Sequence, residues 1–319
     1  MESIFAGKRI VVGVTGSIAA FKVAGWVSSL TKEDARVSVV MTAAATRFVT
    51  PLTFAALSGN RVHTEMFSAI DEEEMTHLDL GREADLMLIA PASANSIAGL
   101  AAGLAGDLLG TAVLATQSPV LICPAMNSRM FRHPATQANL ARLRDYGYTI
   151  IDPDCGVMAC REVGEGRLVE WETVREYLAR SLSPQDLAGS QVLVTAGPTR
   201  EPLDPARFLS NRSSGKMGYA LAQEAFRRGA SVTLVSGPSS LPAPIGVKRV
   251  MVQTAREMHR EVLALAESAQ IVIKAAAVAD FRPAKEQADK VKKNQIDTAL
   301  HLAPNPDILL ELGRQKKAG

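Results

Sequence analysis

The chain has 319 residues, of which 47% are hydrophobic and 21% charged, a composition typical of globular proteins and a length that suggests two domains. The first residues lack an apolar stretch ahead of a small-residue cleavage site, and no window holds 18 uninterrupted apolar residues, so we expect neither a secretory signal nor a membrane span. Three cysteines are too few for a disulfide framework, which favours a reducing cytoplasm.

The net charge of +2 is unevenly distributed. Residues 1–188 carry 16 basic and 21 acidic side chains, whereas residues 189–319 carry 19 and 12. A basic second half suits polyanionic small molecules such as nucleotides. Nucleic acid would fit the same sign, but the basic residues are scattered with few aromatic residues between them, so we expect no nucleic-acid partner.

Apolar runs of strand length alternate with helical patterns, which predicts an α/β protein with parallel sheets. In the first half we expect strands at residues 10–14, 37–41, 86–90, 120–123 and 148–151, and helices near 18–30, 95–102, 107–115 and 134–145. Their continuous hydrophobicity implies strands covered on both faces. After a polar linker at 181–190, the second half has predicted strands at 191–197, 231–237 and 271–277, and helices at 214–228 and near 254–268. We therefore predict two Rossmann-like domains, residues 1–183 and 189–319.

A Gly-Ser turn follows the first predicted strand. Gly16 permits tight backbone geometry, and the amides of Ser17 and Ile18 open a helix, where a phosphate binds well. The G-x-G-x-x-G spacing is absent, and MTAAA stands where an acidic residue would end the second strand, which argues against an NAD(P)-dependent dehydrogenase. A Gly-rich turn without any ligand is the alternative interpretation.

Two later segments carry polar side chains at strand ends. Ser93 and Asn95 follow a strand at the edge where open α/β sheets bind ligands, although alone they read as a capped helix start. Asn127, between two methionines, offers amide donors for a carboxylate, or simply caps a turn.

Two other side chains are candidates for proton transfer. His77 lies beside several acidic residues, which is also typical of a solvated surface position. Cys160 lies in a Gly-rich, loop-like stretch from which a thiol can approach a ligand and donate a proton. Cys123 lies inside a predicted strand and is expected to be inert packing, and Cys155 is undecided.

The motifs GSIAA, THLDL, PASANS, PAMNSRM and AC-x-x-x-G-x-GRL occur in the order and approximate spacing of the flavin-dependent cysteine decarboxylases. Residues 5–182 resemble this family, and in particular its phosphopantothenoylcysteine branch, which implies a flavodoxin-like domain that binds FMN. The resemblance assigns flavin contacts to Gly16, Ser17, Ile18, Thr42, Ser93 and Asn95. It also identifies His77 as the active-site histidine, Asn127 as the residue that grips the substrate carboxylate, and Cys160 as the proton donor.

The implied reaction is decarboxylation of 4′-phosphopantothenoylcysteine to 4′-phosphopantetheine in coenzyme A biosynthesis. By resemblance, the flavin oxidises the cysteine moiety to a thioaldehyde, CO2 leaves, and the ene-thiolate is reduced and protonated. The family holds FMN at a subunit contact, which implies a homo-oligomer built from trimers. Arg161-Glu162 stands where Gly-Asp is frequent in the family, so the details of the flap over the site are open. The alternative is a non-catalytic regulatory flavoprotein, against which His77, Asn127 and Cys160 together speak.

The second half contains a distinctive segment at residues 194–222. A strand ends in Gly-Pro, a long polar loop rich in Arg follows, and a helix begins near Ser213 or Ser214, with Arg212 and Lys216 near a helix N-terminus suited to phosphate. Further on, Asp280 follows a strand, and the run KVKKNQ could screen a triphosphate, although such a run is usually a solvated face.

Together these segments resemble the phosphopantothenate–cysteine ligase domain over about residues 189–312. The resemblance implies that Mg²⁺ and CTP activate 4′-phosphopantothenate as an acyl-cytidylate that cysteine attacks, with Asn211 processing the intermediate; it assigns no metal ligand. CTP contacts would be Asp280, Lys290, Pro306, Asp307, Ile308 and Leu309. Because the family pattern continues beyond Gly319, we expect a shortened ligase half that is catalytically crippled, although it still binds nucleotide weakly, and an intact decarboxylase half.

Overall fold

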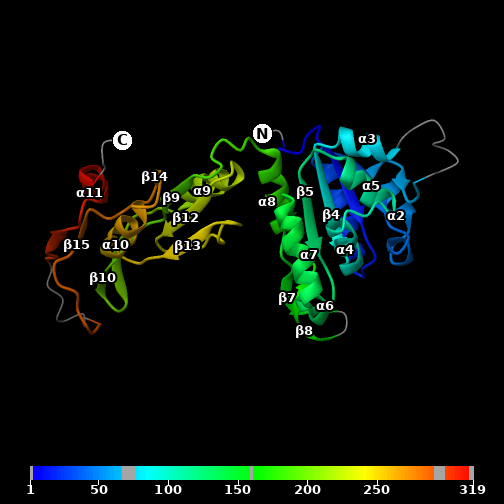
Figure 1. The fold of residues 1–319 in the computed structure, drawn as a ribbon. Helices are drawn as coiled ribbons and strands as arrows, with labels where there is room; N and C mark the ends of the chain where they lie inside the picture. The colour runs from blue at the N-terminus through cyan, green and yellow to red at the C-terminus, as the bar shows by residue number, and fades with distance from the viewer. Residues whose placement is uncertain (1–2, 67–75, 159–160, 291–298, 316–319) are drawn as a thin grey trace. The chain divides into compact units, whose positions relative to one another are not determined.

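The computed structural model describes residues 3–66, 76–158, 161–290 and 299–315. The chain divides into two compact units, Met1–Ser183 and Pro184–Gly319, and each unit has a sheet of its own (Figure 1). No helix in the described ranges is long and apolar enough to cross a membrane.

The first unit is built on a six-stranded parallel sheet in the order β3-β2-β1-β4-β5-β6. Its strands are β1 (Arg9–Val14), β2 (Arg36–Met41), β3 (Val62–His63), β4 (Leu86–Ala92), β5 (Val120–Pro124) and β6 (Thr149–Ile150). The chain reverses its winding direction between β1 and β4, and open α/β sheets bind ligands outside the carboxyl ends of the strands at such a point. β3 was not predicted because a strand of two residues has no hydrophobic pattern.

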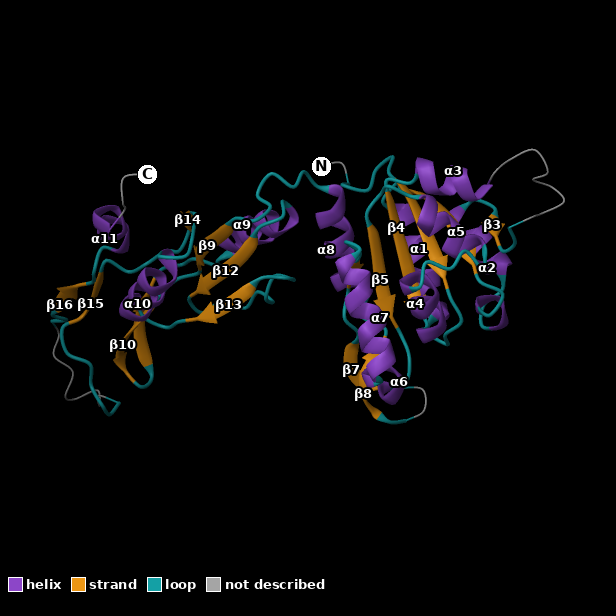
Figure 2. Ribbon diagram, in the orientation of Figure 1, coloured by secondary structure: helices purple, strands orange, loops and turns teal. Residues whose placement is uncertain are grey.

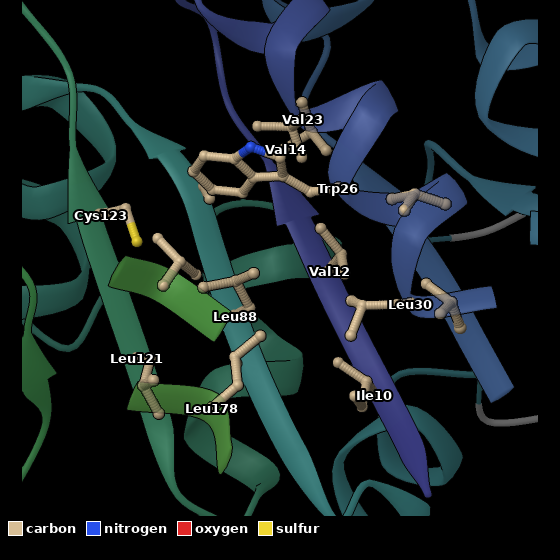
Figure 3. Packing of buried hydrophobic residues seen from close by; sticks show 14 of the residues in the cluster. Ile10, Val12, Val14, Val23, Trp26, Leu30, Leu88, Leu121, Cys123 and Leu178 are labelled. Carbon is tan, nitrogen blue, oxygen red and sulfur yellow. The ribbon is translucent and has the colours of Figure 1, made fainter. Parts of the chain in front are cut away.

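Helices cover both faces of this sheet, as the continuous apolar runs predicted. One face is covered by α1 (Ala20–Lys32), α2 (Pro51–Ser58) and α8 (Trp171–Leu182), and the other by α3 (Thr76–Glu83), α4 (Ala94–Ala101), α5 (Leu108–Ala115) and α7 (Pro134–Asp145). Side chains of β1 alternate between the two cores, because successive residues of a strand point to opposite faces. Figure 3 shows the first core, where Leu178 of α8 lies near Leu88 and Leu121. The prediction of a parallel α/β fold is confirmed.

An antiparallel hairpin follows the sheet. It consists of β7 (Asp154–Val157) and β8 (Val163–Arg167) and was not predicted. Its sequence is polar and Gly-rich, so no apolar alternation reveals it. Figure 2 shows this hairpin at the end of the unit toward which the arrowheads of β4 and β5 point, beside the short helix α6 (Ser128–Arg132).

The second unit has a four-stranded parallel sheet in the order β13-β12-β9-β14. The strands are β9 (Gln191–Ala196), β12 (Ser231–Ser236), β13 (Lys248–Met251) and β14 (Ile271–Lys274), and the helices are α9 (Lys216–Arg227), α10 (Ala255–Ala266) and α11 (Ile308–Gln315). α9 packs on β9 and β12, while α10 and α11 share a core with β9 and β12. The order β13-β12-β9-β14 therefore corresponds to the order β3-β2-β1-β4 in the first sheet, because in both sheets the first strand in the chain lies between the second and the fourth.

Part of the segment predicted as a long polar loop is instead an antiparallel hairpin. Residues 200–210 form β10 (Arg200–Asp204) and β11 (Arg207–Ser210). The turn is held by the buried carboxylate of Asp204, which accepts hydrogen bonds from the amides of Ala206 and Arg207. A second small hairpin, β15 (Phe281–Pro283) with β16 (Leu302–Pro304), contacts β10. Polar side chains with local turn partners, rather than apolar runs, define the β10–β11 hairpin.

An ion pair joins the two helices that flank the amino-terminal segment of the first unit. The Arg175 side chain on α8 donates two hydrogen bonds, 2.9 and 2.7 Å long, to the carboxylate of Glu33 at the end of α1. Ser3 donates a third at 2.8 Å, and the guanidinium lies over the Phe5 ring. The hydrogen bonds from Arg175 lower the pKa of the Glu33 carboxyl against the opposing effect of burial.

We predict that Glu33→Gln lowers the free energy of unfolding of the first unit by about 1 kcal/mol at neutral pH. Because the folded-state pKa of Glu33 is depressed, its stabilisation is fully present above the ordinary Glu pKa of about 4.3 and is lost as the pH falls through the lower folded-state value. The difference from the unchanged protein should therefore shrink on acidification. Urea unfolding followed by tryptophan fluorescence reports on this unit alone, since the sequence has only Trp26 and Trp171.

Glu83→Gln is the matched control for this variant. Glu83 pairs with Arg9 at 3.0 Å, but both side chains are about half exposed or more, so its loss should change stability little. An equal loss for Glu33→Gln at pH 7 and at strongly acidic pH would contradict the assignment.

Candidate functional site

A cavity of about 550 Å³ opens at the carboxyl edge of the first sheet. The turn after β1, the loop after β5 and the β7–β8 hairpin line it. Its volume is within the range of small-molecule sites, and its position is the one where open α/β sheets bind ligands.

The turn after β1 lies against the loop after β2. A Cβ atom on Gly16 would lie 2.6 Å from the Cβ of Ala44, so only glycine permits this approach. The amide of Ser17 donates to the carbonyl of Thr15 at 2.8 Å, and α1 begins at Ala20, two residues after the predicted start. Ser17 and Ile18 line the cavity, and the Ile18 side chain is exposed.

A buried hydroxyl joins this turn to the loop after β4. Thr15 is fully buried; its Oγ1 donates to the carbonyl of Pro91 at 2.6 Å and accepts from the amide of Ser93 at 2.8 Å. The Ser93 hydroxyl caps α4 by accepting from the amide of Ser96, as its sequence position also allowed. Asn95 follows it and is exposed.

Thr42 belongs to the neighbouring loop after β2. Its amide donates to the carbonyl of Val14, and its hydroxyl accepts from the amide of Ala45 in the 3₁₀ turn Ala45–Arg47. The six residues predicted to bind the cofactor therefore follow β1, β2 and β4 at one sheet edge. Among the described residues that line the cavity are Ser17 and Ile18, but not Thr42, Ser93 or Asn95.

Asn127 lines the same cavity from the loop after β5. Its Oδ1 accepts from the amide of Arg129 at 2.9 Å and so caps α6. Its Nδ2 donates to the carboxylate of Glu162 at 2.9 Å. The residue therefore combines both interpretations of the sequence, since it caps a helix and presents an amide donor to a carboxylate.

Two glycines allow the β7–β8 hairpin to pack closely on the loop that carries Asn127. The carbonyl of Gly166 accepts from the amide of Met126 at 2.9 Å, and a Cβ on Gly166 would lie 2.2 Å from the Met126 carbonyl oxygen. A Cβ on Gly164 would lie 2.9 Å from that of Ser128. The G-x-G spacing in this segment was the available sequence signal for this contact.

Sequence reasoning missed the charged residues of the cavity. Lys22 of α1 and Arg167 of β8 line it, and both pair with Glu170. Burial raises the pKa of the Glu170 carboxyl, but the two cations outweigh it and the net pKa is lowered. The two cations offer charge partners to an anionic ligand.

Of the two proposed proton-transfer residues, the structure describes only His77, which does not line the cavity with Asn127. His77 is partly buried near the start of α3, which packs on α5, and it is absent from the described lining of the cavity. Cys160 lies outside the described residues. Cys155 is exposed in β7. Cys123 is fully buried in β5, where burial raises the pKa of its thiol, consistent with inert packing.

In the second unit, the Asn211 side chain connects the loop before α9 to the segment after β14 by hydrogen bonds. Its Nδ2 lies 3.0 Å from the carbonyl oxygen of Ala277 and 3.3 Å from that of Val278. Asp280 is exposed, and its carbonyl accepts from the amide of Asn305 at 2.8 Å, which brings it beside the 306–309 segment. These two predicted regions are therefore adjacent.

The remaining predicted nucleotide contacts differ in accessibility. Lys290 is exposed, Pro306 is partly buried, and the exposed Asp307 accepts from the amide of Leu310 at 3.0 Å. The side chain of Ile308 is buried in the core beneath α10, so only its backbone could meet a ligand, whereas Leu309 is exposed. No cluster of three or more potential metal-ligating side chains occurs within the described ranges.

The comparisons with known families agree with this architecture. The Flavoprotein family matches residues 3–183, and the DNA/pantothenate metabolism flavoprotein C-terminal domain matches residues 187–319. The solved structure of the FMN-dependent cysteine decarboxylase SpaF is 31% identical, covers 56% of this chain and 99% of that chain, and superposes with a TM-score of 0.50. The first unit therefore has the fold of the flavoproteins.

Relatives match along nearly the whole chain. The coenzyme A biosynthesis bifunctional protein CoaBC of Vibrio cholerae is 48% identical over 311 residues, which are 97% of this chain and 78% of the relative. CoaBC of Escherichia coli K12 is 48% identical over 308 residues, which are 95% of this chain and 76% of the relative. The chain belongs to the family of bifunctional coenzyme A biosynthesis proteins.

We predict that Gly166→Ala displaces the β7–β8 hairpin. Gly166 has φ = +132°, which strains any other residue, and the added methyl group would collide with the Met126 carbonyl. Trypsin should then cleave after Arg161 and Arg167 several-fold faster, as measured by mass spectrometry of timed digests.

Gly156→Ala, in the same hairpin, is the control. A Cβ there meets only the flexible Arg167 side chain, so digestion should remain close to that of the unchanged protein. Equal digestion rates for all three proteins would mean that the hairpin does not depend on this contact.

Proposed function

We propose that the first unit decarboxylates 4′-phosphopantothenoylcysteine to 4′-phosphopantetheine with FMN as cofactor. The observation that supports this most directly is the Asn127 amide, which donates to a carboxylate and lines a cavity that is also lined by the cations Lys22 and Arg167. The substrate is an anion that carries the carboxylate to be removed. The identity of nearly half the aligned residues with the CoaBC proteins supports the same assignment.

The cavity suits FMN in size and in backbone geometry. It has about 550 Å³, and the missing side chain of Gly16 leaves the turn after β1 close to the loop after β2. Gly16, Ser17 and Ile18 would hold the cofactor, with Thr42, Ser93 and Asn95 on the adjoining loops. Bound flavin supplies hydride acceptance and return, so the net reaction is redox-neutral.

The residues of the chain would then bind, orient and protonate. Asn127 would fix the substrate carboxylate with its Nδ2. Lys22 and Arg167 would attract the anionic substrate into the cavity. Cys160 would give a proton to the ene-thiolate, and His77 would act as an acid/base or orienting group, because imidazole titrates near neutral pH.

We further propose a homo-oligomer built from trimers, in the cytoplasm. Within one chain, His77 on α3 is not a lining residue of the cavity that contains Asn127. Assembly would allow a second copy to contribute His77 to the site.

For the second unit we propose ligation of cysteine to 4′-phosphopantothenate through an acyl-cytidylate formed from Mg²⁺ and CTP. The adjacency of Asn211, Asp280 and the 306–309 segment supports one site. The net positive charge of residues 189–319 suits a triphosphate.

The experiment that tests this function is a paired assay on one preparation. We expect a flavin absorption band and conversion of phosphopantothenoylcysteine to phosphopantetheine and CO2. Pyrophosphate release that requires phosphopantothenate, CTP and cysteine together would support the ligation proposed for the second unit, and its absence would support the crippled ligase half expected from the sequence. Bound flavin without phosphopantetheine formation would instead indicate a regulatory flavoprotein.

We predict that Asn127→Asp and His77→Asn each retain flavin and lose decarboxylation by at least about 100-fold, because the first places a like charge against the substrate and the second removes a proton-transfer group. If the site is shared between copies, mixing the two variants by unfolding and reassembly should restore part of the activity. Phosphopantetheine formation is the measurement. No recovery in mixed oligomers, verified by mass, would place both residues in a site of one chain.

A further inference from the structure

The Asn127 amide is engaged by a carboxylate of the protein itself. Its Nδ2 donates to Oε2 of Glu162 over 2.9 Å, the same type of contact that the proposed function assigns to the substrate carboxylate. The capping bond from the Arg129 amide to Oδ1 orients the Asn127 amide group, so that Nδ2 is the atom offered to Glu162.

The hairpin brings Glu162 to this position. Met158, which lines the cavity, donates its amide hydrogen to the carbonyl of Glu162 at 2.9 Å, and the amide of Arg161 donates to the carbonyl of Met158 at 2.8 Å. Arg161 has φ = +64°, a left-handed conformation that reverses the chain at this point. Glu162 therefore follows the chain reversal directly and lies across from the Asn127 loop.

The hydrogen bond between Asn127 and Glu162 is weak compared with the contact at the base of the same hairpin. The Glu162 side chain is exposed, and exposed charged contacts contribute little to stability. The base, in contrast, is fixed by the close backbone contact between Gly166 and Met126. A ligand can displace the Glu162 carboxylate without displacing the hairpin.

From this geometry we infer that, in the empty site, the Glu162 carboxylate occupies the position on Asn127 that the substrate carboxylate takes when it binds. Glu162 thereby lowers the affinity of the site for the substrate. Resting on the proposed decarboxylation, the inference is that the two carboxylates compete for the Asn127 amide, because like charges repel at such a distance. Glu162 orients Asn127 in the empty site and moves aside when substrate binds. It is thus an affinity-determining residue and not a catalytic one.

The test is steady-state kinetics of the flavin-loaded Glu162→Ala and Glu162→Gln variants. We expect the KM for phosphopantothenoylcysteine to fall roughly two- to fivefold in Glu162→Ala, with kcat unchanged, and to fall less in Glu162→Gln, which keeps an acceptor without the charge. Inhibition by phosphopantetheine, which lacks the carboxylate, should not change. An unchanged or increased KM, a reduced kcat, or equal effects on both ligands would overturn the inference.

Glu165→Ala is the matched control, since Glu165 lies on the same hairpin and pairs with Arg132 instead. It should alter neither KM nor product inhibition. Should the unchanged protein form no phosphopantetheine, the proposed function fails, and substrate affinity is then read directly by calorimetry because no turnover intervenes. The Glu162→Ala comparison therefore decides the inference in either case.

Discussion

Each unit depends on a buried threonine hydroxyl at the end of its first strand. Thr15 bridges the end of β1 to the loop after β4, and Thr195 in β9 accepts from the amide of Ala276 after β14 at 3.2 Å. Both side chains are fully buried. Because a buried hydroxyl without a partner is costly, these bonds fix the spacing between the two strands that flank the reversal of winding. In the first unit, the loops that carry Ser17 and Ser93 begin at such a bridge.

The hairpins make the two similar sheets different. The β7–β8 hairpin closes over the loop after β5 in the first unit, whereas β10–β11 follows the first strand directly in the second. In the first unit, glycines let the hairpin backbone reach the Asn127 loop at a distance that no side chain would tolerate. The parallel sheet of the first unit thus positions the loops, and the β7–β8 hairpin completes the lining of the cavity.

Most of the parallel strands were predicted because their apolar runs are long. The exceptions are β3, which has two residues, and β13, whose side chains are largely exposed. It did not predict β7–β8 or β10–β11, whose residues are polar and whose stability comes from turn carboxylates and contacts with distant loops. A local pattern cannot reveal such contacts, because the partner residue lies elsewhere in the chain.

In the candidate site, too, some residues could be predicted from local sequence patterns and others could not. Ser17, Ile18 and Asn127 could be proposed from motifs at strand ends, and the structure brings these three to one cavity. Lys22, Arg167 and Glu162 were not proposed, because an isolated charge in sequence usually reads as a solvated surface residue. The roles of His77, Cys160 and Asn211 stay predictions.

The proposed exchange of the Glu162 carboxylate for the substrate carboxylate requires that one end of the β7–β8 hairpin stays fixed while the other end can move. The base of the β7–β8 hairpin is held by backbone contact at Gly166, which any larger residue would disrupt. Its outer end contributes an exposed ionic hydrogen bond, which stabilises by no more than about 1 kcal/mol. Substrate binding therefore replaces a weak internal contact with one of the same chemistry, and the cavity walls need not be rebuilt. The hairpin thereby keeps the Asn127 amide oriented in the empty site, and the competition with Glu162 lowers the affinity for the substrate carboxylate modestly.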